Sequence, residues 1–134
     1  MIGFLLDTNT CIYIIKRKPE QALARLQSLQ VSDVGVSAIT LSELEYGVSK
    51  SSKPEQNKMA LAEFLAPLEI LPYDDLAAAR YGEIIARLEI QGTPIGPLDM
   101  LIGAHALALE CVLVTNNERE FSRIFDLEIE NWAA

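Results

Sequence analysis

The alternation of short apolar runs with longer amphipathic segments is the feature that most constrains the fold of this chain. Short runs of Val, Leu and Ile are typical of strands buried on both faces, whereas apolar residues spaced three or four apart are typical of helices packed on a core. The expected strands are residues 2–6, 34–37, 68–71 and 111–114, with a fifth within 127–132. The expected helical segments are residues 10–18, 20–29, 40–50, 54–65, 75–91 and 98–109.

Strands that alternate with helices favour parallel pairing through right-handed crossovers. We therefore expect an α/β fold, specifically a three-layer α/β/α sandwich around a central, mainly parallel sheet. Pro19 after the first helical segment and Gly92 after the long alanine-rich one mark helix ends. The length of 134 residues fits one domain, so residues 1–134 are expected to form a single domain.

No segment of the sequence is typical of a targeting signal or a membrane span. The apolar residues 1–6 are too few for a signal peptide and are followed by Asp7, and no apolar run approaches the ~20 residues that a membrane helix needs. Cys11 and Cys111 lie among apolar neighbours without metal-ligand spacing, which is typical of reduced, buried thiols. We expect a soluble, cytoplasmic protein with no membrane partner.

The net charge of −8 argues against non-specific binding to nucleic acid, which normally depends on a basic face. The basic residues fall mainly in two small groups, residues 16–18 and Lys50, Lys53 and Lys58, and neither is dense enough to predict a phosphate-binding surface. A nucleic-acid function would therefore need local contacts, or a site whose negative charge is neutralised by a bound metal ion.

Polar side chains follow the expected strands at the points where these strands end. In an open parallel sheet, ligands bind at the carboxyl ends of the strands. Asp7, Ser37, Tyr73 and residues 115–117 are therefore expected to lie together at one edge of the sheet.

Three acidic residues stand at transitions into expected helices, and each also has an ordinary structural explanation. Asp7 has the residue type of a helix N-cap. Glu43 follows Thr40 at the spacing of a capping box in which Thr40 is the N-cap. Asp99 lies in the first turn after Pro97, where the helix macrodipole favours a carboxylate. Taken singly, each structural explanation is the stronger one.

The combination changes this balance, because several helix starts in a parallel α/β fold face the same end of the sheet. Carboxylates about 5 Å apart at an effective dielectric constant of about 20 would repel by about 3 kcal/mol per pair, and a bound cation would relieve that repulsion. Mg²⁺ and Mn²⁺ prefer oxygen ligands, and no cysteine or histidine set competes for them here. We therefore predict a catalytic group of Asp7, Glu43 and Asp99, with Asp7 and Asp99 as metal ligands.

Thr115, Asn117 and Asn9 are the predicted supporting residues of this site. Residues 115–117 end the strongest strand, where either a turn or an oxygen atom near the metal would explain them. Asn9 has the same two explanations: it either lies near the metal or caps the first helix. His105, the only histidine, is expected to be a partly buried structural imidazole rather than a general base.

Four segments together resemble the PIN-domain ribonucleases: residues 5–9 (Leu-Leu-Asp-Thr-Asn), 37–47, 97–106 and 113–121. These segments follow the order and spacing of that family over nearly the whole chain. The resemblance assigns Asp7, Glu43 and Asp99 to the family's three acidic positions. Asn117 matches a fourth position that is Asp in many members, which removes one negative charge and weakens the case for a second metal ion.

Within that family the chain is most similar to the VapC-type toxins. Residues 92–97 before Asp99 and residues 115–121 resemble the branch that cleaves the anticodon loop of initiator tRNA. The resemblance implies a toxin that hydrolyses RNA phosphodiesters with Mg²⁺ or Mn²⁺, forms a homodimer, and has a cognate VapB-type antitoxin whose tail blocks the active site. Two alternatives are a PIN-like module that binds RNA or protein without catalysis, and a phosphatase with an aspartyl nucleophile. The phosphatase would need a second Asp where this chain has Asn9.

Overall fold

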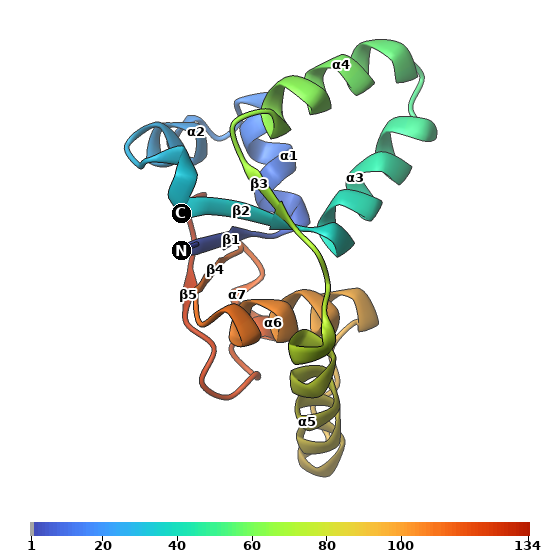
Figure 1. Cartoon of the computed structure of the whole chain (residues 1–134), viewed down its shortest axis with the longest axis vertical. Helices are drawn as coiled ribbons and strands as arrows, with labels where there is room; N and C mark the ends of the chain where they lie inside the picture. The colour runs from blue at the N-terminus through green and yellow to red at the C-terminus, as the bar shows by residue number, and fades with distance from the viewer. Residues whose placement is uncertain (1) are drawn as a thin grey trace.

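The computed structural model describes residues 2–134 and contains a five-stranded sheet in which all neighbouring strands are parallel (Figure 1). The strand order is β3-β2-β1-β4-β5. Leu5 of the central strand pairs with Gly35 on one side and Leu113 on the other. The strands are β1 (Phe4–Leu6), β2 (Val34–Ser37), β3 (Glu69–Leu71), β4 (Val112–Val114) and β5 (Ile129–Glu130).

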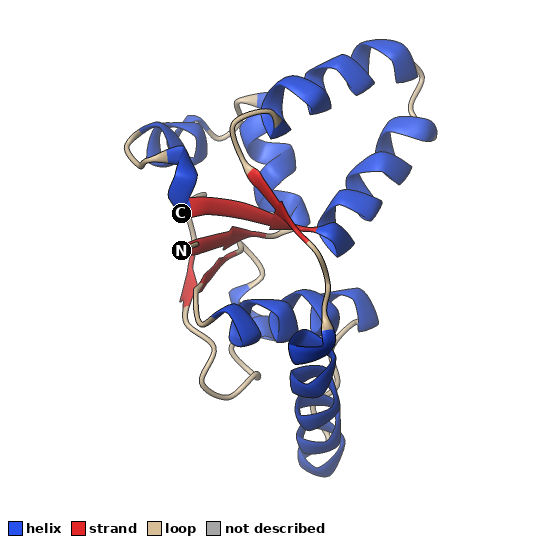
Figure 2. Ribbon diagram, in the orientation of Figure 1, coloured by secondary structure: helices blue, strands red, loops and turns tan. Residues whose placement is uncertain are grey.

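Helices cover both faces of this sheet, so the predicted three-layer α/β/α arrangement is confirmed (Figure 2). The helices are α1 (Thr8–Lys16), α2 (Glu20–Gln27), α3 (Ala38–Ser49), α4 (Pro54–Leu65), α5 (Asp75–Gln91), α6 (Pro97–Leu109) and α7 (Glu118–Phe121), with a 3₁₀ turn, Val31–Asp33, before β2. The first four helices pack on one face, and α5 and α6 pack on the other. No helix within residues 2–134 has the length and apolar character needed to cross a membrane.

The side chains of β1 explain why there are two layers of helices. Successive residues of a strand point to opposite faces, and both Leu5 and Leu6 are fully buried. Leu5 belongs to a core that includes Ile102 of α6. Leu6 belongs to a second core that includes Leu44 of α3. The short apolar run at the start of the chain therefore separates the two cores and contributes side chains to both.

The first helices start earlier than predicted because the residues at the strand ends cap them. The helix after β1 begins at Thr8 rather than at residue 10, and Asp7 is its N-cap. The helix after β2 begins at Ala38 rather than at residue 40, and Ser37 is its N-cap. β1 itself is shorter than predicted and begins at Phe4.

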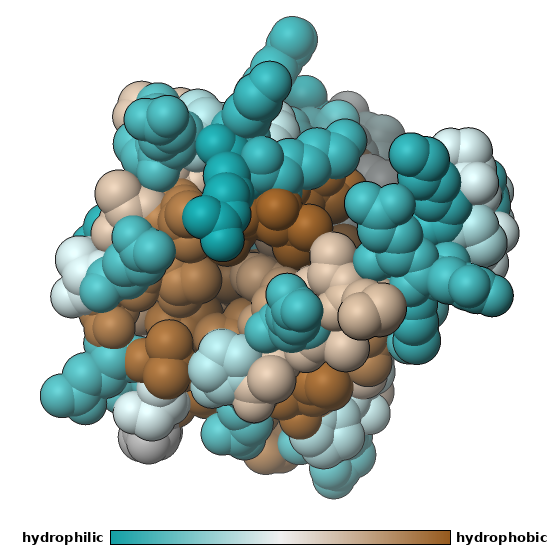
Figure 3. All heavy atoms as spheres, turned by 90° about the horizontal axis from the view of Figure 1, so that it is seen from above, coloured by the Kyte–Doolittle hydropathy of each residue, from teal (hydrophilic) through white to brown (hydrophobic). Residues whose placement is uncertain are grey.

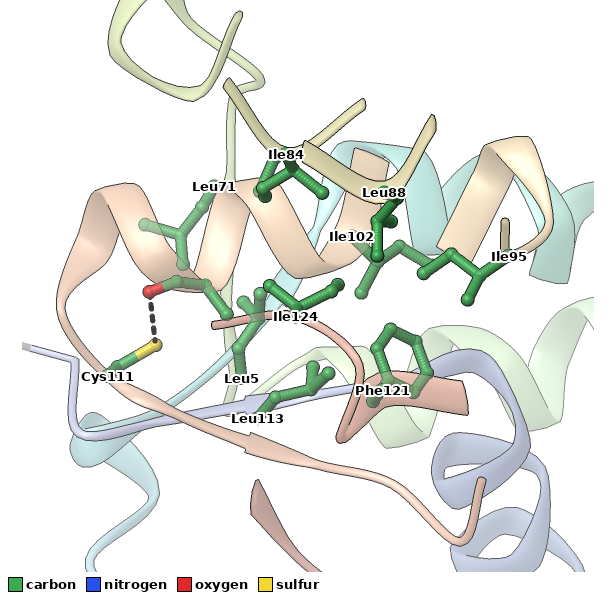
Figure 4. Packing of buried hydrophobic residues seen from close by; sticks show 12 residues of the cluster. Leu5, Leu71, Ile84, Leu88, Ile95, Ile102, Cys111, Leu113, Phe121 and Ile124 are labelled. Carbon is green, nitrogen blue, oxygen red and sulfur yellow. Dashed lines mark hydrogen bonds between the residues drawn. The ribbon is translucent and has the colours of Figure 1, made fainter. Parts of the chain in front are cut away.

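The last third of the chain contains an element that the sequence pattern did not predict. The four-residue helix α7 is too short to show a helical period of apolar residues. The fifth strand is present but covers only Ile129–Glu130 of the expected 127–132. Figure 4 shows what the segment after β4 contributes to the first core: Phe121 and Ile124 lie against Leu113 and Ile102.

Two mid-helix glycines give a matched test of this core. Gly82→Ala in α5 adds a methyl group with nothing within 4 Å, so we expect it to raise the free energy of unfolding by about 0.5–1 kcal/mol. Gly103→Ala in α6 places its methyl group 2.6 Å from Cδ1 of the buried Ile124. We expect this crowding to cancel the helix gain and leave a net loss of about 1 kcal/mol, measured by urea unfolding. Equal stabilisation by both changes would contradict the packing.

Candidate active site

Asp7 lies directly after the central strand and is 5% exposed. Its backbone N–H donates to the Val114 carbonyl over 3.0 Å, and its Oδ1 atom accepts from the Thr10 N–H over 2.9 Å. The capping explanation of Asp7 is therefore confirmed, and it places a carboxylate at the carboxyl end of β1. Burial raises the pKa of this carboxyl group, while hydrogen bonds from Thr115 and Thr10 lower it and the charge of Glu43 raises it further.

Glu43 is not part of a capping box. Ser37 caps α3 by accepting from the Ile39 N–H over 3.1 Å, so Glu43 is the sixth residue of the helix. Thr40, the expected N-cap, is fully buried inside α3, and its hydroxyl has no hydrogen-bond partner among residues 2–134. Glu43 instead accepts a hydrogen bond from the Thr8 hydroxyl over 2.6 Å. This contact directs the carboxylate from α3 toward the start of α1.

Asp99 lies in the first turn of α6, as predicted, after an N-cap, Gly96, that makes no side-chain hydrogen bond. The pKa of Asp99 is raised from 3.8 to about 6, first by burial and then by the charges of Glu120, Asp7 and Glu43. A hydrogen bond from Asn117 opposes this shift. After burial, the charges that act on Asp99 thus come from three other elements, namely α3, α7 and the N-cap of α1.

Glu120 is the acidic residue that the sequence analysis missed. It lies in α7, and its Oε2 atom accepts from the Asn117 Nδ2 atom over 3.3 Å. Among the neighbouring charges it has the largest effect on the pKa of Asp99. Glu120 therefore adds a fourth carboxylate near Asp99 to the three that the sequence predicted. The spacing of three residues from Asn117 to Glu120 was the available signal, because it corresponds to about one helical turn.

The predicted supporting residues divide into two that join the acids and one that does not. The buried Thr115 hydroxyl accepts from the Asn117 N–H over 2.9 Å and makes a hydrogen bond with the Asp7 carboxylate. Asn117 is the N-cap of α7 and contacts Glu120. Asn9 is an exposed second residue of α1, and the capping role considered for it belongs to Asp7.

His105 organises a second group at the same edge of the sheet. Its Nδ1 atom lies 2.8 Å from the Ser37 hydroxyl, its ring is hydrogen-bonded to the Pro72 carbonyl, and the Tyr73 ring packs edge-on with centroids 5.4 Å apart. Burial lowers the pKa of this imidazole, which is 1% exposed. The structural interpretation of His105 is therefore the one the geometry supports. Ser37 and Tyr73 lie at the predicted edge but contact His105.

The acid group is suited to a divalent cation bound through one or two carboxylates. None of the three ion pairs within residues 2–134 involves Asp7, Glu43, Asp99 or Glu120. No three acidic, histidine or cysteine side chains in that part of the chain stand close enough to form a ready-made ligand set. Mg²⁺ commonly keeps several waters and uses only one or two carboxylates, so the predicted pair Asp7 and Asp99 fits its chemistry.

Comparison with known proteins agrees with this fold. A family model described as PIN domain matches residues 4–126. The tRNA(fMet)-specific endonuclease VapC of Salmonella typhimurium is 48% identical, over 98% of this chain and 99% of its own. The chain belongs to the VapC family of PIN-domain ribonucleases. Ribonuclease VapC2 of Rickettsia felis is also similar, at 45% identity over 96% of this chain and 97% of its own.

Two crystal structures of VapC-family complexes have the same fold. VapBC2 from Rickettsia felis bound to a promoter DNA fragment matches with a TM-score of 0.92 and 44% identity, covering 98% of this chain and 99% of that one. DNA-bound VapBC from Salmonella typhimurium matches with a TM-score of 0.93 and 48% identity over the same shares. The sequence-based assignment to the VapC family is confirmed.

The raised pKa of Asp99 predicts how the stability of this VapC-family protein depends on pH without metal. The folded state holds the Asp99 proton more tightly than the unfolded chain, so stability should fall as pH rises from about 4 to about 6. Asp99→Asn should remove that loss. The stability advantage of Asp99→Asn over the parent, measured by urea unfolding in EDTA, should therefore grow across this window and then level off.

Asp75→Asn is the matched control, because Asp75 is also a carboxylate in the first turn of a helix. The stability of Asp75→Asn relative to the parent should not increase between pH 4 and pH 6. An Asp99→Asn advantage that stays constant from pH 4 to pH 7 would contradict the raised pKa of Asp99.

Proposed function

We propose that this chain is the toxin of a toxin–antitoxin pair and a metal-dependent endoribonuclease that hydrolyses RNA phosphodiesters. The observation that carries the proposal is the placement of Asp7, Glu43, Asp99 and Glu120 at one edge of the sheet, where burial first and then the charges of the other three acids raise the pKa of Asp99. Such crowding is costly in an empty site and is relieved when a cation binds. We propose Mg²⁺ or Mn²⁺ as the cofactor and Asp7 and Asp99 as its ligands.

Each residue of the group has a role that follows from its contacts. When bound, the ion would activate a water nucleophile and stabilise charge on the transition state. Asp7 is immobilised by the Thr10 N–H and by Thr115, so its carboxylate has one fixed direction. Glu43 is positioned by the Thr8 hydroxyl on its Oε1 atom, which leaves Oε2 to orient a water molecule. We propose Asp7, Glu43 and Asp99 as the catalytic residues.

The substrate that we propose is the anticodon loop of initiator tRNA. The relatives from Salmonella typhimurium and Shigella flexneri, 48% and 42% identical, both carry the name tRNA(fMet)-specific endonuclease VapC. Residues 92–97, which lead into Asp99, are one of the segments in which this chain resembles that branch. A single-stranded loop also suits an edge-of-sheet site, because its bases can be splayed out.

The partner that we propose is a VapB-type antitoxin in the cytoplasm, acting on a toxin homodimer. An apolar cleft of 340 Å³ runs between α1, α3 and α4, and Glu43 is part of its lining. Figure 3 shows apolar surface within a hollow on this side of the molecule, bordered by hydrophilic side chains. An antitoxin segment seated in this cleft would reach the acid group. The related structures titled VapBC support a partner of this kind.

Cleavage of initiator tRNA in the presence and absence of metal tests the proposed activity. With Mg²⁺ or Mn²⁺ the parent should cut within the anticodon loop, and EDTA should abolish cutting. Asp7→Asn should lower the rate by about 10²–10³-fold, and Thr8→Val, which frees Glu43, by about 10–100-fold. Asp75→Asn is the control and should leave the rate unchanged, because Asp75 is not among the charges that act on Asp7 or Asp99.

Two outcomes would count against the proposal in different ways. Cleavage that persists in EDTA or in Asp7→Asn would exclude the metal-dependent mechanism. Binding of RNA without cleavage under every metal condition would favour the alternative of a non-catalytic PIN-like binding module.

A further inference from the structure

A separate cavity of 270 Å³ lies among α5, α6 and the segment after α7. Its floor is apolar and includes Ile84, Leu88 and Ile124, which Figure 4 shows packed together in the first core. Its charged lining contains three of the chain's six arginines and two acids: Arg80, Arg87, Arg123, Glu83 and Asp126. We refer to this cavity as the arginine pocket.

The charge of the arginine pocket is opposite to that of the chain. Three arginines against two carboxylates leave it positive, whereas the whole chain has a net charge of −8. The cleft beside Glu43 has one lysine and one glutamate, and a third cavity at the α3–α4 connection has one lysine and two glutamates. An anionic ligand is therefore better accommodated by the arginine pocket than by either of the other two cavities.

The exposed ring of Phe125 gives the arginine pocket a surface for stacking, in addition to its positive charge. Phe125 is 64% exposed, and the Arg87 guanidinium lies over its ring at 4.9 Å from the centroid. An aromatic ring in contact with an arginine is a surface on which a nucleic-acid base can stack. Arg25 makes a similar contact at α2, but one of its rings, Trp132, is only 5% exposed and so cannot serve this purpose.

The other two arginines keep donors for an incoming phosphate. Arg80 pairs with Glu83 over 3.3 Å on the surface, with 47% and 68% of the two side chains exposed, and such surface pairs are weak. Arg123 donates one N–H to the Pro94 carbonyl over 2.9 Å, and a guanidinium has five donors. Phosphate is the anion that this planar, forked geometry matches best.

The arginine pocket shares two chain segments with the acid group. Arg123 follows Glu120 by three residues, at the end of the α7 segment. The carbonyl that Arg123 holds belongs to Pro94, in the loop that leads into α6 and Asp99. A polyanionic strand lying against this loop and α7 would therefore contact both sites.

We infer that the arginine pocket is a second RNA-binding site, in which Phe125 stacks an unpaired base and Arg80, Arg87 and Arg123 contact the adjoining phosphates. The inference rests on the proposed ribonuclease function, and it adds the part of the surface that holds the RNA away from the cleaved bond. Acidic side chains of a protein segment could pair with the arginines, but a carboxylate does not stack on the exposed Phe125 ring as a base does. A single-stranded RNA loop uses both.

Equilibrium binding of an RNA stem-loop tests the inference. The probe is the initiator-tRNA anticodon arm with a fluorescent label, measured by anisotropy in EDTA so that it stays uncut. Arg87→Gln should weaken binding about 5–10-fold and lower the slope of log affinity against log salt by about 0.7–0.9. Phe125→Leu should weaken binding about tenfold and leave the salt slope unchanged. Phe125→Trp should keep the RNA affinity of the parent. Arg25→Gln is the matched control and should bind like the parent.

A blunt RNA duplex without a loop separates stacking from charge. Arg87→Gln should weaken duplex binding as well, whereas Phe125→Leu should not. Parent-like binding of the stem-loop by folded Arg87→Gln and Phe125→Leu would overturn the inference, as would a parent that does not bind. Variants that shift the chain toward monomer in sedimentation without changing RNA affinity would assign this face to a second copy and also overturn it.

The two proposals fail separately. If the parent cuts tRNA while the pocket variants bind and cut like the parent, only the second site is excluded. If the parent binds through Arg87 and Phe125 but never cuts, only the proposed nuclease activity is excluded.

Discussion

The placement of Asp7 at the end of the central strand is the constraint on which the rest of this structure depends. Its N–H continues the pairing of β1 with β4, and its carboxylate begins α1 by capping Thr10. A cap of this kind contributes about 1 kcal/mol. The same side chain is buried, so its charge must be compensated locally. Hydrogen bonds from Thr10 and Thr115 supply part of that compensation, and a cation would supply the rest.

The edge of the sheet holds two groups, the four acids and a second group around His105. In the second group, Ser37 both caps α3 and contacts His105 of α6. These two helices carry Glu43 and Asp99, so the Ser37–His105 contact ties together the helices that present the two acids. The buried imidazole therefore acts as a positioning element for the acids at the same edge.

Much of the fold could be predicted from the sequence, because the buried parallel strands have continuous apolar runs and the helices between them have an apolar face. The alternation of Leu5 and Leu6 between two cores follows directly from strand geometry. The helix starts were harder to predict, since Ser37 and Thr40 are both good capping residues. Only the three-dimensional contacts show that Ser37 is the cap and that Thr40 is buried.

Asp7, Glu43 and Asp99 were predicted because each stands at a transition from a strand or loop into a predicted helix. Glu120 was missed because no helix was predicted where it lies. It lies in a four-residue helix after the strand end, where no hydrophobic period marks its orientation. Its proximity to Asp99 is a tertiary property, expressed in the raised pKa of Asp99. The arginine pocket could not be predicted from the sequence either. Arg80 and Arg87 lie far along the chain from Arg123, and none of the three belongs to the two basic groups that the sequence shows.

The central claim is that the crowded acids form a binding site for one divalent cation. The most direct measurement is the anomalous scattering of Mn²⁺ in crystals of the parent and of Asp7→Asn. We expect one strong manganese peak in contact with the Asp7 and Asp99 carboxylates, and we expect it to be lost or much weakened in Asp7→Asn. A parent crystal saturated with Mn²⁺ that shows no peak between these two residues, or the same peak in both proteins, would contradict it.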